Sequence, residues 1–572
     1  MADGGGPHPP TPEDWDEVPP EDDGDDPCPV VPIAYRDGRY WFLSPSGEMR
    51  IMSQAALKGD GLIFLFNGDI SWLIRRFQRH DRDGQPVQDF NTRLALSWLI
   101  RRATAAGVFD PGMSLRGHGV WKVNGVPAPV VHCGDAIFVD GKSRPPGLRI
   151  GIDVFPRRSR AVRPTFTDPA TVDDGVELRR LLGLWRYEAD GDQDLLLGWI
   201  GLAMLGGWSR WRTHLLVSAQ TGSGKSALAS LIFSVLGAGS FEFNDFTEPG
   251  IRAAMLDEAR TPILDEAENT GTGAESVARV VALVRKMSSG RGAQIARGAG
   301  LEGGAATGTA VGCAALLSVN PPPFLPADAT RFLRLELIRA TDDPDAQARV
   351  DAARAWGAAR SPQLRARMLG RWRDYEEAWA VWRLALVGVG CNGRMADMLA
   401  SLLAARDVLL FDVPRQVVTG DTLLSLAPRI AAMRADDAEM GDGRRCLNTL
   451  MGHTIKHWIS GRLMSLGEMV AKAFSEDNDK DEFSHALRTH GLAIDRADPQ
   501  APALLIANSH RALEALFHDT TWASGGWAHS RGPARLPGRE KDATPGSVHG
   551  VRSRAVRIPK TVLDGDEPSG GA

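Results

Sequence analysis

The chain has 572 residues, of which 43% are hydrophobic and 24% are charged. The length predicts several domains, and the composition is typical of a globular protein and excludes a largely disordered or membrane-embedded chain. The five cysteines are scattered without a CxxC pair, which argues against a disulfide framework and a zinc ribbon and fits a reducing cytoplasm. The longest apolar stretch, residues 195–208, is too short and too often broken by glycine to span a bilayer, so no membrane contact is expected.

The first 28 residues are acidic and rich in proline and glycine. They contain ten Asp and Glu and no Lys or Arg, so we expect a disordered tail. Removing these ten charges from the net charge of −5 leaves about +5 on the remaining chain, which suits a polyanionic partner. The tail has two interpretations, a solubilising segment or a mimic of DNA that competes for a basic groove.

Residues 29–141 predict a small α+β accessory domain. Short alternating runs at residues 39–43 and 136–139 are typical of strands, and residues 91–107 have the periodicity of an amphipathic helix. The proline- and arginine-rich segment 142–175 predicts a linker over the surface.

A phosphate-loop pattern lies in the domain expected over residues 176–340, after two predicted helices. The apolar run that begins at Leu215 predicts a buried strand, and the following loop of small residues opens an apolar helix. Ala219 replaces the first glycine of the pattern and is small enough to fit. The loop predicts a nucleotide site in which backbone N–H groups surround the phosphates. The residues expected to bind ATP are Gly222, Ser223, Gly224, Lys225 and Ser226.

Lys225 and Ser226 have specific expected partners in the nucleotide site. A second motif downstream adds two carboxylates to this site. Lys225 would contact the β- and γ-phosphates, and Ser226 would hold Mg²⁺. About forty residues downstream, the apolar run 261–264 ends in Asp265 and Glu266. Asp265 would bind Mg²⁺ through water, and Glu266 would activate the attacking water as general base. Two acids after an apolar run also occur at helix starts, so this assignment depends on the phosphate loop upstream.

Two further apolar runs complete the expected sheet. Residues 314–319 end at Asn320, which can orient the attacking water or can simply be a turn residue before proline. The run 332–337 follows Arg331 and contains Arg334. Apolar strands separated by helices predict an α/β fold with a parallel sheet that binds ligands at its carboxyl edge.

The rest of the chain predicts helices over residues 341–461 and a mixed domain over 462–563, with a disordered end at 564–572. Residues 531–560 carry eight Lys or Arg, among them Arg552, Arg554 and Arg557, against two acids. Such a basic segment fits a winged-helix DNA-binding domain.

Together these motifs resemble phage or plasmid DNA primase–helicases, specifically their superfamily 3-like helicase part, an AAA+-type P-loop ATPase. The resemblance covers about residues 30–563. The segments that carry it are GWIGLAMLGG with WRTH, AQTGSGKSAL, ILDEAE, VRKMSSGRGAQIARG, LLSVNPPP and DATRFLRLEL, with RGHGVWKVNG, VVHCGDAIFVDG, LLIANSHRAL and HGVRSRAVRIP on the flanks.

The resemblance implies further roles for individual residues. Asn320 would be the sensor-one residue, and Arg331 would be the arginine finger, with Arg334 as the second candidate. A DNA-contacting hairpin is implied within residues 291–312, where Arg291 and Arg297 are the bases expected to touch DNA. The resemblance also implies Mg²⁺-dependent ATP hydrolysis, single-stranded or forked DNA as partner, and a ring of six subunits. Larger relatives carry a zinc-binding module and a primase domain upstream, so priming is expected from a separate primase.

Three functional hypotheses follow. The first is an ATP-dependent DNA helicase or translocase acting in phage or plasmid DNA replication, in the cytoplasm (of the bacterial host if a phage encodes it). The alternative is an AAA+-type nucleotide-switch loader or remodeller that binds DNA or protein without unwinding. The third, a scaffold with a degenerate site, is disfavoured by the four residues Lys225, Ser226, Asp265 and Glu266.

Overall fold

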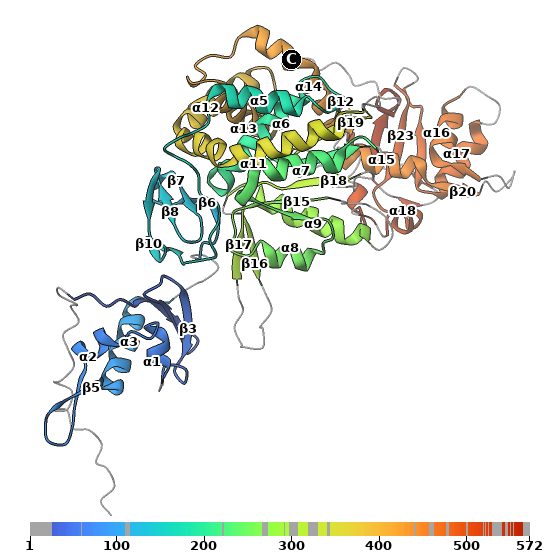
Figure 1. Ribbon diagram of the computed structural model, residues 1–572. Coiled ribbons are helices and arrows are strands. Elements are labelled where there is room, and N and C mark those ends of the chain that lie inside the picture. Colours follow the sequence, from blue (N-terminus) through green and yellow to red (C-terminus); the bar gives the residue numbers. More distant parts are fainter. Residues whose placement is uncertain are drawn as a thin grey trace, which may run out of the picture. The chain divides into compact units, whose positions relative to one another are not determined.

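The computed structural model divides the chain into two compact units (Figure 1). Unit 1 consists of Met1–Pro323 and Arg331–Leu426, and unit 2 of Phe324–Thr330 and Ala427–Ala572. The structure describes residues 26–58, 60–108, 115–219, 222–265, 273–290, 292–296, 307–318, 330–339, 344–439, 442–456, 463–475, 480–498, 501–518, 520, 522–523, 525–528, 540–543, 547–548, 551–552 and 554–563. Among these residues, no helix is both long enough and apolar enough to cross a membrane.

The first part of unit 1 combines antiparallel strands with short helices. Its elements are β1 (Val31–Arg36), β2 (Arg39–Leu43), β3 (Met49–Ser53), α1 (Gly61–Leu65), α2 (Ser71–Arg76), β4 (Gln78–His80), β5 (Pro86–Phe90) and α3 (Thr92–Ala105). Helix α3 begins at Thr92 because the side chain of Asn91 accepts hydrogen bonds from the backbone N–H groups of Arg93 and Leu94. The rings of Trp72, Phe77 and Trp98 pack together in the core. The strand predicted at 39–43 and the helix predicted at 91–107 are confirmed.

A second group of strands packs beside the central sheet of unit 1. They are β6 (Gly119–Val123), β7 (Val126–His132), β8 (Ile137–Val139), β9 (Lys142–Arg144), β10 (Leu148–Ile150) and β11 (Asp153–Phe155). The boundary expected between residues 141 and 142 differs from the structure, because it falls in a tight turn between the paired strands β8 and β9. The linker expectation is also wrong for β11, where Val154 and Phe155 are fully buried.

The central sheet of unit 1 has six strands in the order β12-β19-β13-β18-β15-β14. The strands are β12 (Arg186–Tyr187), β13 (His214–Ala219), β14 (Ser240–Phe243), β15 (Thr261–Leu264), β18 (Ala315–Ser318) and β19 (Phe332–Ile338). All neighbours are parallel except β12, which pairs antiparallel with β19. The predicted parallel α/β sheet is therefore confirmed with one antiparallel edge strand. Strands β15 and β18 are fully buried, as expected for parallel strands covered on both faces.

Helices cover this sheet. They include the two predicted before the phosphate loop, α5 (Val172–Leu182) and α6 (Asp192–Leu205), and those between the strands, α7 (Lys225–Leu236), α8 (Glu248–Ala254) and α9 (Gly273–Met287). Three long helices follow, α11 (Ala346–Gly370), α12 (Trp372–Gly388) and α13 (Gly393–Leu410). Helices α6 and α13 lie very close, since a Cβ atom added to Gly198 would sit 2.1 Å from the carbonyl oxygen of Leu402. The helices after residue 340 are therefore part of unit 1 up to Leu426.

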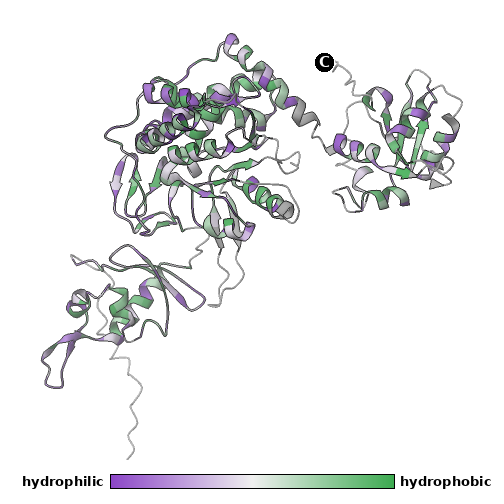
Figure 2. Ribbon diagram, turned by 45° about the vertical axis from the view of Figure 1, so that its right-hand side comes forward, coloured by the Kyte–Doolittle hydropathy of each residue, from purple (hydrophilic) through white to green (hydrophobic). Residues whose placement is uncertain are grey.

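Unit 2 is built on a four-stranded antiparallel sheet, β22-β23-β27-β24. Figure 2 colours the central strands of this sheet as hydrophobic, in agreement with the burial of Leu504, Ile506 and Ile558. Its elements after α14 (Gly420–Glu439) are α15 (Asp442–Gly452), β20 (Thr454–Lys456), β21 (Leu463–Ser465), α16 (Leu466–Phe474), α17 (Lys480–Thr489), β22 (Leu492–Asp495), β23 (Ala503–Ala507), α18 (Arg511–Leu516), β24 (Glu540–Ala543), β25 (Ser547–Val548), β26 (Val551–Arg552), β27 (Ala555–Pro559) and α19 (Lys560–Leu563).

One basic residue assigned to DNA binding has a structural role in unit 2. The guanidinium of Arg557 lies 2.9 Å from the carboxylate of Asp495, and both side chains are largely buried. It also donates a hydrogen bond of 2.6 Å to the carbonyl of Ala501. Arg557 therefore ties β27 to neighbouring segments, and the winged-helix interpretation of residues 462–563 stays a prediction.

Candidate nucleotide-binding site

The predicted phosphate loop lies between β13 and α7, at the carboxyl edge of the central sheet. Gly222 and Gly224 have φ angles of 84° and 82°, in the left-handed region that favours glycine. Helix α7 begins at the next residue, Lys225, so its free N–H groups point toward the loop. Ser223 is buried, whereas Ser226 in the first turn of α7 is exposed. A strand, a left-handed glycine turn and a helix N-terminus thus occur in the order that phosphate binding requires.

The structure brings together the lysine and the first carboxylate of the two motifs. The Nζ atom of Lys225 lies 3.4 Å from Oδ1 of Asp265, and only about a tenth of each side chain is exposed. Asp265 directly follows β15, and its backbone N–H donates to the carbonyl of Phe243 in β14. Strand β18 lies between β13 and β15, so residues distant in sequence meet at one edge.

This donor set fits a magnesium nucleotide. A hydroxyl and a carboxylate are the oxygen ligands that Mg²⁺ takes in phosphate sites, and Ser226 and Asp265 supply them. Position 224 of the loop leaves no room for a side chain, because a Cβ atom on Gly224 would lie 2.9 Å from Nε1 of Trp185. Glu266, Asn320, Arg291 and Arg297 lie outside the described residues, and their roles stay predictions.

Arg331 lies at the opposite end of the parallel strands, where β13 and β19 begin. It precedes β19, whose first residue, Phe332, pairs with His214 at the start of β13. The last pair of these parallel strands joins Ala219 to Leu337, beside the phosphate loop. Six residues at 3.3 Å each place the backbone of Arg331 about 20 Å from that edge. Arg331 is therefore out of reach of phosphates held by its own Lys225.

The surroundings of Arg331 are buried and basic. His214 is fully buried and its ring nitrogen Nε2 lies 2.8 Å from Oγ of Ser288. Burial lowers the pKa of His214 to about 3, and the positive charges of Arg212 and Arg331 lower it further. Arg334, the second candidate for the finger, lies in the middle of β19 opposite Leu216.

Two residues at the phosphate loop were missed at the sequence level. Trp185 precedes the edge strand β12 and donates its indole N–H to the carbonyl of Gly224 at 2.9 Å. Arg339 follows β19, and its Nε atom lies 3.9 Å from the position of a Cβ atom on Gly222. The position of Arg339 just after a predicted strand could have indicated it. Trp185 had no such signal, because β12 has only two residues.

The hairpin implied within residues 291–312 exists as an antiparallel pair, β16 (Ala293–Ala296) and β17 (Thr307–Ala310). A contact from another part of the chain holds its second strand. The backbone N–H of Thr309 donates to Oδ1 of Asp257 at 3.2 Å. Asp257 follows α8 and has a φ angle of 60°. Contact of the hairpin with DNA stays a prediction.

Comparison with known proteins gives remote similarity only. No protein-family model matches the chain. No curated protein matches it. Among solved structures, it is similar to SCCmec type IV Cch, an active helicase, with 12% identity, 94% of each chain covered and a TM-score of 0.48. It is also similar to the C-terminal region of NrS-1, with 10% identity, 76% of this chain and 95% of that chain covered, and a TM-score of 0.29. Because these scores are low, the description of the site rests on its own strand order and loop geometry.

Proposed function

We propose that this chain is a P-loop ATPase that binds ATP with Mg²⁺ at the carboxyl edge of the central sheet of unit 1. The observation that carries the proposal is the contact between Lys225 and Asp265, 3.4 Å apart beside a left-handed glycine loop. A lysine at a helix N-terminus next to a carboxylate supplies both charges that a magnesium nucleotide needs.

Each residue has a distinct part in the proposed reaction. Lys225 would neutralise charge on the β- and γ-phosphates, and Ser226 and Asp265 would hold Mg²⁺. The bound Mg²⁺ supplies positive charge against the transferring phosphoryl group. Glu266 takes the proton from the attacking water, and Asn320 orients that water. Arg339 adds a second cation on the loop side of the site.

Two substitutions test the assignment. Lys225→Ala removes the charge that holds the phosphates, so both ATP binding and turnover should fall. Glu266→Gln preserves the shape of the side chain but removes the base, so ATP should bind without being turned over. Binding of a fluorescent ATP analogue and phosphate release are measured for both variants. Hydrolysis at the wild-type rate by Glu266→Gln would show that the catalytic assignment is wrong.

We further propose that the ATPase is a DNA helicase or translocase of phage or plasmid replication, acting as an AAA+-type ring of six subunits with a separate primase. The motif resemblance and the hairpin β16–β17 support this proposal. Strand displacement on a forked duplex distinguishes it from the alternative, a loader or remodeller. ATP-dependent DNA binding without displacement would favour the loader. Sedimentation with ATP measures the subunit number.

Arg297 tests whether the hairpin contacts DNA. Loss of one phosphate contact flattens the slope of log affinity against log salt by about 0.7 for single strands. Arg297→Ala should show this change with single-stranded DNA. An unchanged slope and affinity would remove Arg297 from the DNA path.

Deletion of residues 1–28 should tighten binding if the tail is a DNA mimic, and should have no effect if the tail is solubilising.

A further inference from the structure

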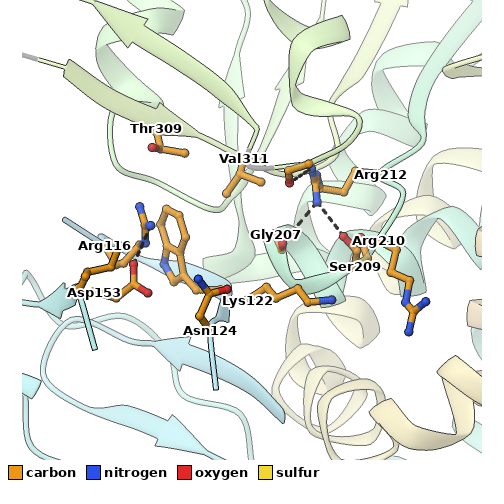
Figure 3. Close-up of a pocket in the computed structure, with 13 residues that line it drawn as sticks. Arg116, Lys122, Asn124, Asp153, Gly207, Ser209, Arg210, Arg212, Thr309 and Val311 are labelled. Carbon is orange, nitrogen blue, oxygen red and sulfur yellow. Dashed lines mark hydrogen bonds and ion pairs between the residues drawn. The ribbon is translucent and has the colours of Figure 1, made fainter. Parts of the chain in front are cut away.

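A pocket of about 380 Å³ lies in unit 1 at the base of the β16–β17 hairpin (Figure 3). Three segments distant in sequence form its walls: the strands β6 and β11 with their flanks, the segment 207–212 that leads into β13, and the hairpin base at Gly290, Thr309 and Val311. A cavity of this volume lies within the range of small-molecule sites and exceeds the space of a few water molecules.

The charge of the lining is strongly positive. Four basic side chains, Arg116, Lys122, Arg210 and Arg212, and one carboxylate, Asp153, line the pocket. Arg116 is paired with that carboxylate, with Nη2 2.7 Å from Oδ1 of Asp153. Two of the remaining cations, Arg212 and Lys122, have no carboxylate partner among the residues that the structure describes.

Arg212 is a buried guanidinium held by backbone carbonyls. It is 1% exposed. Its N–H groups donate to the carbonyl oxygens of Met287, Ser209 and Gly290 at 2.6, 2.7 and 2.9 Å. Burial lowers its pKa to about 10, so it remains charged at neutral pH. Carbonyl dipoles orient the guanidinium but do not cancel its net charge, so the pocket wall has a fixed positive potential.

Lys122 provides an exposed cation in the lining of the pocket. It is the exposed position of β6, whose other residues are buried, and the register of β6 against β7 shifts between Trp121 and Val123, at this position. Figure 3 shows its side chain extending toward the side of the pocket formed by Ser209 and Arg210. Arg210 is exposed and lies 3.1 Å from Glu376. Breaking a surface ion pair of this kind costs little free energy, so Arg210 can bind another anion in place of Glu376.

We propose that this pocket binds one nucleotide unit of a single-stranded nucleic acid, with its backbone phosphate between Lys122 and Arg210 in the field of Arg212. The hairpin base forms one wall, so a strand that follows the hairpin passes the pocket, and Asn124 and the indole of Trp121 line the rest of its path. The inference rests on the nucleic-acid part of the proposed function. It adds a contact surface from β6, in the flanking segment RGHGVWKVNG, to which the resemblance assigns no role.

Charge reversal at Lys122 tests the proposal. Lys122→Glu is compared with Lys142→Glu, which alters an exposed lysine of the same sheet on β9, outside the pocket. Affinity for a labelled oligo(dT) is measured without ATP over a range of salt concentrations, so the result does not depend on ATP hydrolysis. Lys122→Glu should weaken binding at least roughly five- to tenfold at 50 mM salt and flatten the salt slope by about 0.7, whereas Lys142→Glu should retain the wild-type slope.

Three results would overturn the proposal. Equal losses of affinity for both lysine variants would show that the effect comes from the overall electrostatic potential of the sheet and not from the pocket. An unchanged slope for Lys122→Glu at an unchanged Tm would remove the pocket from the DNA path. Displacement of the labelled strand by millimolar inorganic phosphate would make the pocket a free-anion site. If Lys122→Glu lowers the Tm, Asn124→Asp places a carboxylate in the pocket at another exposed position and should also weaken binding, by a smaller factor because the charge changes by one unit instead of two.

Discussion

The indole N–H of Trp185 donates a 2.9 Å hydrogen bond to the carbonyl oxygen of Gly224, the last residue of the phosphate loop. Trp185 is 6% exposed, so its ring is fixed by packing before any nucleotide arrives. The same carbonyl also accepts from the backbone N–H of Leu228 in α7 at 3.0 Å, so two donors keep it from turning into the phosphate site, where it would repel the anion. Trp185 therefore preorganises the loop for phosphate from outside the motif.

Removal of this hydrogen bond should weaken nucleotide binding. Trp185→Phe retains an aromatic ring but lacks the N–H donor, and one hydrogen bond contributes about 1 kcal/mol. We expect the KM for ATP to rise roughly fivefold. The control is Trp208→Phe, which loses an equivalent bond of 3.0 Å to the carbonyl of Pro127, away from the loop. Equal KM values for the two variants would contradict the role of Trp185.

Arg331 should act on the nucleotide of a neighbouring subunit. It lies at the amino edge of the sheet, at the opposite end of β19 from its own phosphate loop. An arginine supplied across an interface contributes on the order of 10³-fold or more in turnover. Arg331→Ala and Lys225→Ala should each be inactive, and mixing them should partly restore ATPase activity. Normal hydrolysis by Arg331→Ala alone, or no rescue at any mixing ratio, would contradict this role and leave Arg331 with a structural role in the packing around His214.

Stability should depend on pH through Asp257. Burial raises its pKa to about 6, above the value of about 3.9 expected in the unfolded chain. Between these values the folded protein retains a proton that the unfolded chain has lost, so this contribution to stability falls as pH rises from about 4 to 6. The full effect is up to about 3 kcal/mol.

Asp257→Asn isolates this effect, because the amide cannot ionise but retains an oxygen that accepts from Thr309. The Tm of the variant relative to wild type should rise between pH 4 and pH 7. Asp351→Asn, on the exposed surface of α11, is the control for loss of a carboxylate. A constant Tm difference across this range would show that Asp257 does not titrate there.

The contact between α6 and α13 should tolerate no side chain at Gly198. A Cβ atom there would lie 2.1 Å from the carbonyl oxygen of Leu402, so Gly198→Ala must push the helices apart. Overpacking of this kind costs about 1–3 kcal/mol, and the Tm of unit 1 should fall. Gly388→Ala in α12, where a Cβ atom meets nothing within 4 Å, should leave the Tm unchanged or raise it. Equal Tm values for the two variants would contradict the close packing.

The sequence by itself determined the elements whose cause is local. An apolar run, two glycines and a helix-forming stretch fix β13, the phosphate loop and α7, because each requirement is met within about twenty residues. The apolar run before Asp265 and the caps of α3 and α5 are of the same kind. The parallel sheet also followed from the sequence, since buried strands separated by helices have few other arrangements.

Only the tertiary structure decided which distant residues meet. The pairing of β8 with β9 converted part of an expected linker into sheet, because proline and arginine indicate a surface segment but not its hydrogen-bond partner. The strand order brought Lys225 to Asp265, and parallel register put Arg331 at the far edge. Trp185 and Lys122 gained their positions from β12 and β6 in the same way. Several of these contacts join distant segments, since Lys225 and Asp265 lie 40 residues apart and Trp185 and Gly224 lie 39 residues apart. Local propensity does not encode pairings of this kind.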